Sequence, residues 1–443
     1  MRALLVNPYI HDFAAYDLWA KPLGLLKIAA YLKGLNCEIS LIDCLDRLNP
    51  SLNKFLEGKQ PKSSPFGSGQ YYSEEITKPD IYKSIPRKYK RHGIPPALFN
   101  KILGITPRPD IILVTSGMTY WYPGVFETIN ILKHKFPGVP LVLGGIYASI
   151  CAEHAKEKSG ADFVFKGNDI TEIIKLIHNI TKINLNLPLF KEKGEAFPYY
   201  ELYPKLSYIT LRTSSGCPFK CSYCGWYLLE NKFRQINPDL VIEHIEYFNK
   251  KYDIKNFAFY DEALLYNAEN HIIKILQKVI NKNLQINFHT PNGLHARFMT
   301  LKLAKLMKTA GFIQPRIALE TTKEERQKHT GFKTSTEEFL KAVEHLKNAG
   351  YSSKDIAVNI LIGLPGRDFE EIKDSIEFAA KLGLKIFLEE YSPIPGTKDF
   401  ESSGLSTDSD PLLHNNSIFP LFKPEDLPVV QSLKKLAHDL NSR

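Results

Sequence analysis

Long apolar runs are missing from this sequence of 443 residues. It has no run of about 18 apolar residues, the length that a membrane-spanning helix needs. Its N-terminus also lacks the charged start, apolar core and cleavage site of an export signal. We therefore expect a cytoplasmic protein without a transmembrane segment. With 44% apolar residues and this length, the chain is expected to fold into two or three globular domains.

A concentrated charge of one sign is missing as well. The 57 Lys and Arg exceed the 48 Asp and Glu, which gives a net charge of +9, but the excess is scattered. Its densest patch is the short run from Arg87 to Arg91, which suits a solvated face or an anion-binding loop better than a nucleic-acid interface. We expect no nucleic-acid partner.

Cysteine is scarce, and half of the six cysteines gather in the stretch Cys217-Pro-Phe-Lys-Cys221-Ser-Tyr-Cys224. Three closely spaced thiolates can hold three irons of a [4Fe–4S] cluster and leave the fourth iron open to a substrate or cofactor. Structural zinc normally takes four ligands, and the next histidine, His244, lies in an apparent helix. A disulfide is not favoured, because three is an odd number and nothing marks the chain as exported. The other cysteines are interpreted as buried apolar residues: Cys37, Cys44 and Cys151.

Residues 1–182 show short apolar strands that alternate with helical stretches. This pattern predicts an α/β domain with a doubly wound parallel sheet of the flavodoxin-like type. The expected strands are Arg2–Asn7, Cys37–Asp43, Asp110–Thr115, Pro140–Gly144 and Asp162–Lys166. An insertion over about residues 49–109 is too long for an ordinary connection, and we interpret it as a lid or an interdomain cover.

In such sheets the ligand lies beyond the carboxyl ends of the strands. Small or polar residues stand at those ends here and would let a large flat ligand approach the backbone: Asn7, Thr115, Ser116, Gly144, Gly145 and Gly167. Glycine also follows strands in many folds for turn reasons alone, so both interpretations stay open on the residues themselves.

A linker over residues 183–202 precedes a second domain, residues 203–400, in which strands and helices alternate strictly. The expected strands are Ser207–Thr213, Asn256–Tyr260, Gln285–His289, Pro315–Leu319, Ile356–Ile362 and Lys385–Glu389. Six βα units in a row predict an open, partial (β/α)6 barrel with its active face at the carboxyl ends of the strands. A C-terminal extension, residues 401–443, contains an amphipathic helix that we expect to dock on the barrel.

The spacing C-x3-C-x2-C, with an aromatic residue before the last cysteine, resembles the radical SAM superfamily. Together with the first domain, the chain resembles radical SAM enzymes that contain a cobalamin-binding domain. The resemblance implies a [4Fe–4S] cluster on Cys217, Cys221 and Cys224, S-adenosylmethionine (SAM) on the open iron, and cobalamin at the strand ends of the first domain. The Asp-x-His-x-x-Gly pattern of the cobalt-ligating type is absent, so cobalamin is expected to bind without a histidine ligand and with its base displaced.

The resemblance also assigns a SAM pocket to the strand ends of the barrel. Tyr223 is expected to lie on the adenine, Asp261 or Glu262 to face the ammonium, and Glu320 to pair with the ribose. Gly363 would admit an adenine edge, Asn292 follows the third strand, and Arg316 is the candidate partner of the methionine carboxylate. Any single carboxylate at a strand end is often just a solvated loop residue, but several polar strand ends after a cysteine triad favour a binding site.

The function that the resemblance implies is reductive cleavage of SAM to a 5′-deoxyadenosyl radical, with methylation of an unactivated carbon as the outcome. An alternative is cyclisation or rearrangement without methyl transfer, and another is an iron–sulfur sensor or scaffold without turnover. The implied partners are a small-molecule or lipid-like substrate and an external electron donor such as flavodoxin or ferredoxin.

Overall fold

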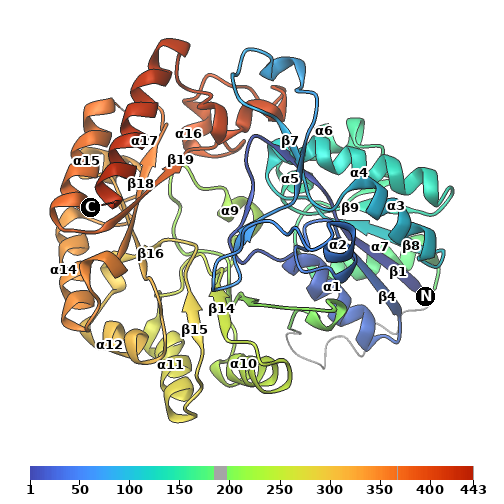
Figure 1. Ribbon diagram of the computed structural model, residues 1–443, viewed down its shortest axis with the longest axis horizontal. Coiled ribbons are helices and arrows are strands. Elements are labelled where there is room, and N and C mark those ends of the chain that lie inside the picture. The colour runs from blue at the N-terminus through green and yellow to red at the C-terminus, as the bar shows by residue number, and fades with distance from the viewer. Residues whose placement is uncertain (184–196, 367, 443) are drawn as a thin grey trace. The chain divides into compact units, whose positions relative to one another are not determined.

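The chain forms two units in the computed structural model, which describes residues 1–183, 197–366 and 368–442 (Figure 1). The first unit comprises Met1–Leu206 and Thr407–Ser417, and the second comprises Ser207–Ser406 and Ile418–Arg443. Most of the linker expected over 183–202 lies outside the described residues. No helix in the described ranges is both long and apolar enough to span a membrane.

A five-stranded parallel sheet organises the first unit, in the order β10-β9-β8-β1-β4. The strands are β1 (Arg2–Asn7), β4 (Glu38–Asp43), β8 (Ile111–Val114), β9 (Leu141–Leu143) and β10 (Phe163–Val164). This is the flavodoxin-like order, and the predicted fold class is confirmed. The order reverses between β1 and β8, which is the topological switch point.

Helices cover both faces of this sheet because alternate strand residues point to opposite sides. Leu4 and Val6 of β1 join the core formed with α3 (Pro96–Ile105) and α4 (Tyr122–Lys135). Ala3 and Leu5 join the core formed with α1 (Leu23–Gly34) and α7 (Ile170–Thr181). The short helices α5 (Ile146–Ile150) and α6 (Ala152–Lys158) follow β9.

The insertion after β4 builds small antiparallel sheets of its own. Its elements are α2 (Pro50–Phe55), β5 (Gly69–Gln70), β6 (Ser73–Glu75), η1 (Asp80–Tyr82) and β7 (Lys90–His92). β7 pairs with β6 and with β2 (Ile10–Asp12), and β5 pairs with β3 (Tyr16–Asp17). The insertion therefore adds strands to the loop that leaves β1. Its role as a lid remains a prediction.

The second unit contains two parallel sheets, in the orders β11-β14-β15 and β16-β17-β18-β19. The strands are β11 (Ile209–Leu211), β14 (Asn256–Phe259), β15 (Asn287–His289), β16 (Leu294–His295), β17 (Arg316–Glu320), β18 (Ala357–Ile362) and β19 (Lys385–Glu390). All the strands of the predicted partial barrel are present. The sequence analysis did not include β16, which is only two residues long.

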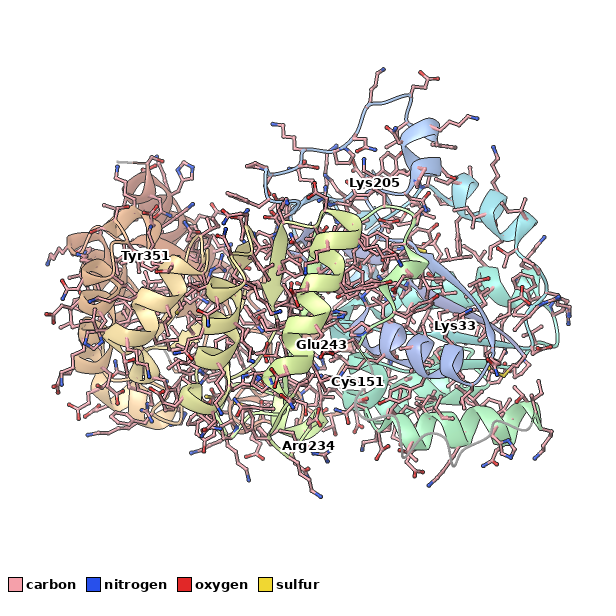
Figure 2. The ribbon with its side chains drawn as sticks, turned by 90° about the horizontal axis from the view of Figure 1, so that it is seen from below. Lys33, Cys151, Lys205, Arg234, Glu243 and Tyr351 are labelled. Carbon is pink, nitrogen blue, oxygen red and sulfur yellow. The ribbon has the colours of Figure 1, made fainter. Side chains whose placement is uncertain are left out.

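Helices follow the strands of the second unit, as the alternating pattern predicts. They are α10 (Pro238–Tyr252), α11 (Ile272–Asn281), α12 (Leu301–Thr309), α13 (Glu324–His329), α14 (Thr336–Asn348) and α15 (Phe369–Lys381). On α10, Val241 and Ile242 are buried, whereas Glu243 is exposed on the outer face, where Figure 2 labels it. Asn237 caps α10, and Ser335 and Glu338 form a capping box at α14.

The last helix, α17 (Leu427–Asn441), packs against α15 and β19. The side-chain amide of Asn441 bonds to the backbone N–H and C=O of Ile386, and Lys434 pairs with Glu390. These bonds attach the end of the chain to the outer strand of the second sheet.

Candidate functional site

The cysteine loop follows β11 and the short strand β12 (Ser214–Ser215), which pairs with β13 (Arg234–Gln235). Gly216 starts the loop with a φ of +70°, and a Cβ there would lie 2.5 Å from the carbonyl oxygen of Lys232. Only glycine accepts both the conformation and the close approach. The loop therefore leaves the sheet directly beside residues 232–234.

The three thiols of the loop are close enough to influence one another. Burial raises the pKa of Cys221 to about 11, and it also raises the pKa values of Cys217 and Cys224. Lys333 opposes this rise at all three thiols, because an ammonium favours the thiolate form. Among the described residues, no three Cys, His, Asp or Glu side chains could hold a single metal ion. The three thiols, which share Lys333 as a neighbour, are the candidate ligands of a cluster, in which three irons take one thiolate each.

Bonds to a later segment hold the middle of the cysteine loop. Ser222 donates from Oγ to Asp399 Oδ2 at 2.8 Å, and the backbone N–H of Asp399 donates to the Ser222 carbonyl. His329 Nε2 lies 3.3 Å from the other Asp399 oxygen. Asp399 belongs to α16 (Lys398–Glu401) and is buried. These bonds attach the middle of the cysteine loop to α16.

A buried ion pair lies next to the thiols. Glu320 ends β17 after a bulge, with a φ of +66°, and its Oε1 is 2.9 Å from Nζ of Lys333. Burial alone would lower the pKa of Lys333, but Glu320 and the thiols of Cys221 and Cys224 raise it above the ordinary value. Lys333 therefore stays charged beside the cysteine loop. The sequence analysis missed this residue, because a lysine in a loop gives no signal of its own.

Tyr223 lies between the cysteines and Glu320. Burial, followed by the field of Glu320, raises the pKa of its hydroxyl well above the ordinary value. Its ring packs against Leu361, Leu364 and Tyr391 at the ends of the last two strands. Gly363, also predicted to contact SAM, follows β18 with a φ of +92°. The structure thus brings Tyr223, Glu320 and the region of Gly363 together.

The two carboxylates after β14 have different surroundings. Asp261 accepts hydrogen bonds from the backbone N–H of Thr213 at 3.0 Å, from Thr213 Oγ1 at 2.9 Å and from Ser214 Oγ at 2.5 Å. It therefore braces the strand that leads into the cysteine loop. Asn292 donates to the Asp261 backbone carbonyl at 3.5 Å. Glu262 has no such role.

Both oxygens of Glu262 are buried without a hydrogen-bond partner in the described structure. The nearest cation is Arg212, whose Nη2 is 3.4 Å away and whose guanidinium stacks 4.9 Å from the Trp226 ring. Burial raises the pKa of Glu262 to about 7, although Arg212 lowers it. A buried carboxylate in this state is ready to accept a cationic donor. Of Asp261 and Glu262, Glu262 is the carboxylate whose oxygens can still accept hydrogen bonds from a ligand.

Arg316 lies at the start of β17, at the opposite end of the strand from Glu320. Its Nη1 is 3.3 Å from Glu389, and its guanidinium stacks 4.0 Å over the Phe387 ring. Nearby, Thr290 Oγ1 and Asn359 Oδ1 are buried without hydrogen-bond partners among the described residues. Arg316 is thus already paired, and Lys333 is the cation that lies among the thiols.

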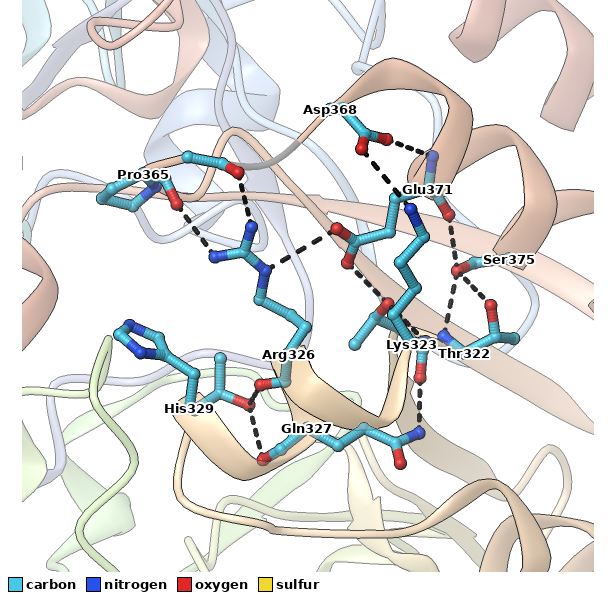
Figure 3. Close-up of polar contacts among 12 residues, drawn as sticks. Thr322, Lys323, Arg326, Gln327, His329, Pro365, Asp368, Glu371 and Ser375 are labelled. Carbon is cyan, nitrogen blue, oxygen red and sulfur yellow. Dashed lines mark hydrogen bonds and ion pairs between the residues drawn. The ribbon is translucent and has the colours of Figure 1, made fainter.

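A polar network, shown in Figure 3, connects the end of β17 with the loop after β18. Arg326 donates to the carbonyls of Pro365 at 3.0 Å and Gly366 at 2.6 Å, and it lies 3.7 Å from Glu371. Thr321, the residue after Glu320, donates to Glu371 at 2.7 Å. These bonds fix the spacing between two strand ends that are predicted to hold SAM.

The strand ends of the first unit hold one another through backbone groups. Ser116 donates to the Gly144 carbonyl at 2.7 Å, and a Cβ on Gly145, whose φ is +95°, would lie 2.4 Å from the Ser116 carbonyl oxygen. A Cβ on Gly144 or Gly167 would meet nothing within 4 Å. The backbone is open at these two glycines, which would let a large planar ligand such as a corrin approach it. Of the other residues predicted there, Asn7 donates to Asp43 at 2.7 Å and Thr115 is partly exposed.

The switch point of the first unit is covered by the chain's own segment 407–417. Trp121 Nε1 and the Asn415 amide donate to Asp12 at 2.8 and 2.9 Å, and Tyr122 donates to Asp410 at 3.1 Å. Behind Gly145, the space is filled by aromatic rings. Tyr147 is fully buried, stacks on Tyr122 and shares a 2.6 Å hydrogen bond with His154.

Residues 211–379 match the Radical SAM superfamily. This chain contains a radical SAM domain. The match extends from the end of β11 into α15, so it includes the cysteine loop, Glu262, Glu320 and Lys333. The superfamily uses a [4Fe–4S] cluster and SAM.

Two curated relatives have different activities in their names. An uncharacterized methyltransferase of Pyrococcus horikoshii is 24% identical over 324 residues, which are 66% of this chain and 69% of the relative. The anaerobic magnesium-protoporphyrin IX monomethyl ester cyclase of Rubrivivax gelatinosus is 21% identical over 361 residues, 72% of this chain. The alignment takes in 63% of the cyclase, so this chain spans less than two thirds of its length.

Two solved structures share the fold. TsrM, a radical SAM methyltransferase from Kitasatospora setae solved with tryptophan and a SAM analog, has a TM-score of 0.63 over 90% of this chain and 74% of TsrM. OxsB, a cobalamin-dependent SAM radical enzyme solved with aqua-cobalamin and SAM, has a TM-score of 0.56 over 99% of this chain and 56% of OxsB. Both are 14% identical to it. The resemblance to cobalamin-binding radical SAM enzymes is confirmed, and at this identity it establishes the fold.

Proposed function

We propose that this radical SAM enzyme uses cobalamin and methylates an unactivated carbon of a small-molecule or lipid-like substrate. The observation that carries the proposal is the set of three neighbouring thiols on one loop beside a charged lysine, within the residues that match the radical SAM superfamily. When bound, the cluster supplies one electron, SAM supplies the carbon-centred radical that takes hydrogen from the substrate, and cobalamin supplies the methyl group. We place the reaction in the cytoplasm, with an external electron donor.

The residues of the second unit have distinct binding tasks in this proposal. Cys217, Cys221 and Cys224 hold the cluster. Glu262 accepts the SAM ammonium, because its two oxygens are buried without hydrogen-bond partners. Lys333 pairs with the methionine carboxylate, because Glu320 and the thiols of Cys221 and Cys224 outweigh its burial and keep it charged. This assignment replaces Arg316, which Glu389 and Phe387 already engage.

Glu320 serves two partners in this pocket. One oxygen holds Lys333, which leaves the other lone pairs of the carboxylate for a ribose hydroxyl. Tyr223 and Gly363 border the adenine side, and Asn292 supports the pocket through the backbone of Asp261. Arg326 and Glu371 keep the ribose and adenine sides at a fixed spacing. The pocket is thereby organised by residues that follow five strands: β11, β14, β15, β17 and β18.

Cobalamin is assigned to the open glycines of the first unit. Gly144 and Gly167 leave space for its planar face, and Asn7, Thr115, Ser116 and Gly145 form the polar and backbone surroundings. Tyr147 is fully buried and bonds to His154, and the sequence has no Asp-x-His-x-x-Gly pattern that would supply a cobalt ligand. We therefore propose that cobalamin binds with its base displaced and without an axial protein ligand.

The relatives favour one alternative. Because the sequence also aligns with an anaerobic cyclase, the same domains could perform a cyclisation or rearrangement in which no methyl group is transferred. A sensor or scaffold is less well supported, because it would not need buried carboxylates and a lysine arranged around an open iron site.

The deciding experiment is anaerobic reconstitution followed by mass spectrometry of the SAM products, with the Cys224→Ala variant as the control. A methyltransferase that also uses the radical gives both S-adenosylhomocysteine and 5′-deoxyadenosine. A cyclase gives 5′-deoxyadenosine without S-adenosylhomocysteine. Neither product from the reconstituted wild-type protein, with dithionite as reductant, would contradict an enzymatic role and favour the sensor.

A further inference from the structure

A groove of about 510 Å³ lies on the second unit and takes no part in the SAM pocket described above. It is lined by Phe233, Arg234, Gln235, Tyr266, Asn267 and Phe298, which we call the rim groove. Its walls are aromatic, and Tyr266 is 36% exposed although it is a large apolar residue. An exposed aromatic surface of this kind marks an interaction site.

Aromatic contacts connect the rim groove directly with the cysteine loop. Phe219, between Cys217 and Cys221, packs edge-on against Tyr266 with ring centroids 5.9 Å apart. It also contacts Phe298 at 5.9 Å, and Tyr266 in turn contacts Phe233 at 5.2 Å. The close approach of Gly216 to Lys232 fixes the same two segments side by side. Whatever binds in the rim groove therefore lies next to the loop that holds the cluster.

Three cations without an ion-pair partner in the described structure lie at or beside the rim groove, whereas the exposed acid next to Asn267, Glu269, is paired with Lys302. Arg234 is the charged side chain among the lining residues, and Lys220 and Lys232 are exposed nearby on the loop and before β13. Figure 2 labels Arg234 at the periphery of the side chains. In the described structure no ion pair engages any of the three, whereas many other surface lysines are paired with acids. Unpaired cations around an aromatic groove are complementary to an acidic protein surface.

The walls of the groove are also held rigidly. Gln235 donates to the Tyr266 carbonyl at 3.0 Å, and Asn267 donates to the Gln235 side chain at 2.9 Å. These bonds lock β13 to the turn after β14, so the groove is preformed. A preformed surface loses little entropy when a partner docks.

We propose that the rim groove is the docking surface for a small acidic flavoprotein that delivers one electron at a time to the cluster. The inference rests on the proposed function, since only a cluster that must be reduced needs such a partner. The anionic hydroquinone of the flavin loses one electron and becomes the neutral semiquinone, and the oxidised cluster gains that electron. No proton or other reactant is needed. Arg234, Lys232 and Lys220 attract the acidic face, and Tyr266 and Phe233 provide its apolar contact.

The test is a charge reversal, Lys232→Glu with Arg234→Glu, and the matched control is Lys381→Glu with Lys435→Glu. The control residues are exposed on α15 and α17 and make no ion pair in the described part of the chain. Two rates of cluster reduction are measured anaerobically, one with an acidic flavodoxin and one with dithionite. Binding of the oxidised flavodoxin is titrated separately by flavin fluorescence, without any turnover.

The groove variant is expected to lower the flavodoxin-driven rate and the flavodoxin affinity by roughly tenfold to a hundredfold, because electrostatic steering is reversed. The wild-type rate should fall steeply with salt, and the variant should lose that dependence. Dithionite reduction and SAM affinity should stay unchanged in both variants. An unchanged flavodoxin rate and affinity in the groove variant would overturn the proposal. So would slower cleavage of SAM by the groove variant with dithionite as reductant, because the groove would then act on the SAM pocket and not on electron delivery.

Failure of this inference is distinguishable from failure of the proposed function. If dithionite does not reduce a cluster in the wild-type protein, the radical SAM assignment of the thiols fails. If dithionite does so and only the flavodoxin experiment shows no difference, the cluster assignment stands and the rim groove has another partner.

Discussion

Two buried carboxylates, Asp12 in the first unit and Glu262 in the second, differ in how their oxygens are satisfied. In the first unit, the carboxylates around the switch point are hydrogen-bonded to the chain itself, as Asp12 is to Trp121 and Asn415. In the second unit, Glu262 has two buried oxygens without hydrogen-bond partners, and Thr290 and Asn359 each have one such atom. Buried polar groups are normally paired, so unpaired ones at a strand end indicate a ligand with matching groups.

This difference indicates what kind of ligand each unit can take. The second unit presents charges and vacant acceptors, which suit a polar zwitterion such as SAM. The first unit presents open backbone at Gly144 and Gly167, which suits contact with a broad, flat surface. The two edges thus use the same α/β architecture for different recognition chemistry, and each prediction below tests one side of the contrast.

The largest effect is expected at the cysteine loop. Replacing Cys217, Cys221 or Cys224 with Ala should abolish the broad visible absorbance of thiolate-bound iron and all SAM cleavage, because a cluster with two protein thiolates is not held. The measurement is the absorption spectrum after anaerobic reconstitution. Replacing Cys37, Cys44 or Cys151 with Ala is the control and should leave the spectrum intact. If the absorbance survived the loss of Cys217, Cys221 or Cys224, these three cysteines would not be the ligands of the cluster.

The cysteine triad could be predicted because its information is local: three thiols within eight residues need no tertiary structure to be recognised. The strands could be predicted because a parallel strand buried on both faces is a short apolar run. The role of Lys333 could not be predicted, because its partner Glu320 is 13 residues away and only the fold brings the two together as an ion pair. The segment 407–417, which covers the switch point, could not be predicted either, because its contacts join residues far apart in the sequence. Asn415 lies 403 residues from its partner Asp12.

The next effect concerns the open glycines of the first unit. Gly144→Phe should abolish retention of hydroxocobalamin after gel filtration, because the ring occupies the strand-end surface. Stability should change little, since a Cβ at Gly144 meets no atom within 4 Å and its φ is not positive. Gly104→Phe, at another open glycine on α3, is the control and should retain the corrin.

A wild-type protein that retains no corrin would remove cobalamin from the proposal and leave the radical SAM domain unaffected. Nitrogen superhyperfine splitting in the electron paramagnetic resonance spectrum of the reduced corrin would contradict binding without an axial ligand. Equal retention by Gly144→Phe and wild type would place the corrin elsewhere than at Gly144.

A smaller effect is expected at the ion pair beside the thiols. Glu320→Gln should weaken SAM binding by roughly tenfold, or about 1.4 kcal/mol. Lys333→Met should weaken it further, because it removes the cation for the methionine carboxylate, and Lys333→Arg should restore part of the loss. Glu320→Gln and Lys333→Met each also leave a buried charge unpaired, which destabilises the protein by about 3 kcal/mol.

The double variant Glu320→Gln with Lys333→Met separates these roles. It removes both charges, so thermal stability should return toward that of the wild type while SAM affinity stays low. SAM affinity is measured by equilibrium dialysis of the reconstituted protein. If the double variant regained affinity together with stability, the pair would be a packing feature and not part of the SAM pocket.

The smallest effect is a pH dependence of stability caused by Glu262. The two buried oxygens of this residue lack hydrogen-bond partners in the described structure, which indicates a cationic ligand. Burial raises the pKa of this carboxyl to about 7 in the folded protein, above its value of about 4.3 in an unfolded chain. The native state therefore binds more protons than the unfolded state between these values, and stability should fall as pH rises from about 4.5 to 7. Glu262→Gln should remove that slope, as measured by denaturant unfolding of the cluster-free protein, while Glu243→Gln on the outer face of α10 should keep it.

SAM affinity of the reconstituted wild-type protein should change in the opposite direction, rising through about pH 7 as the carboxylate forms and meets the ammonium. If the slope of stability with pH were the same in wild type and Glu262→Gln, the carboxyl would already be paired, and the contrast between a satisfied and a vacant strand end would lose its strongest residue.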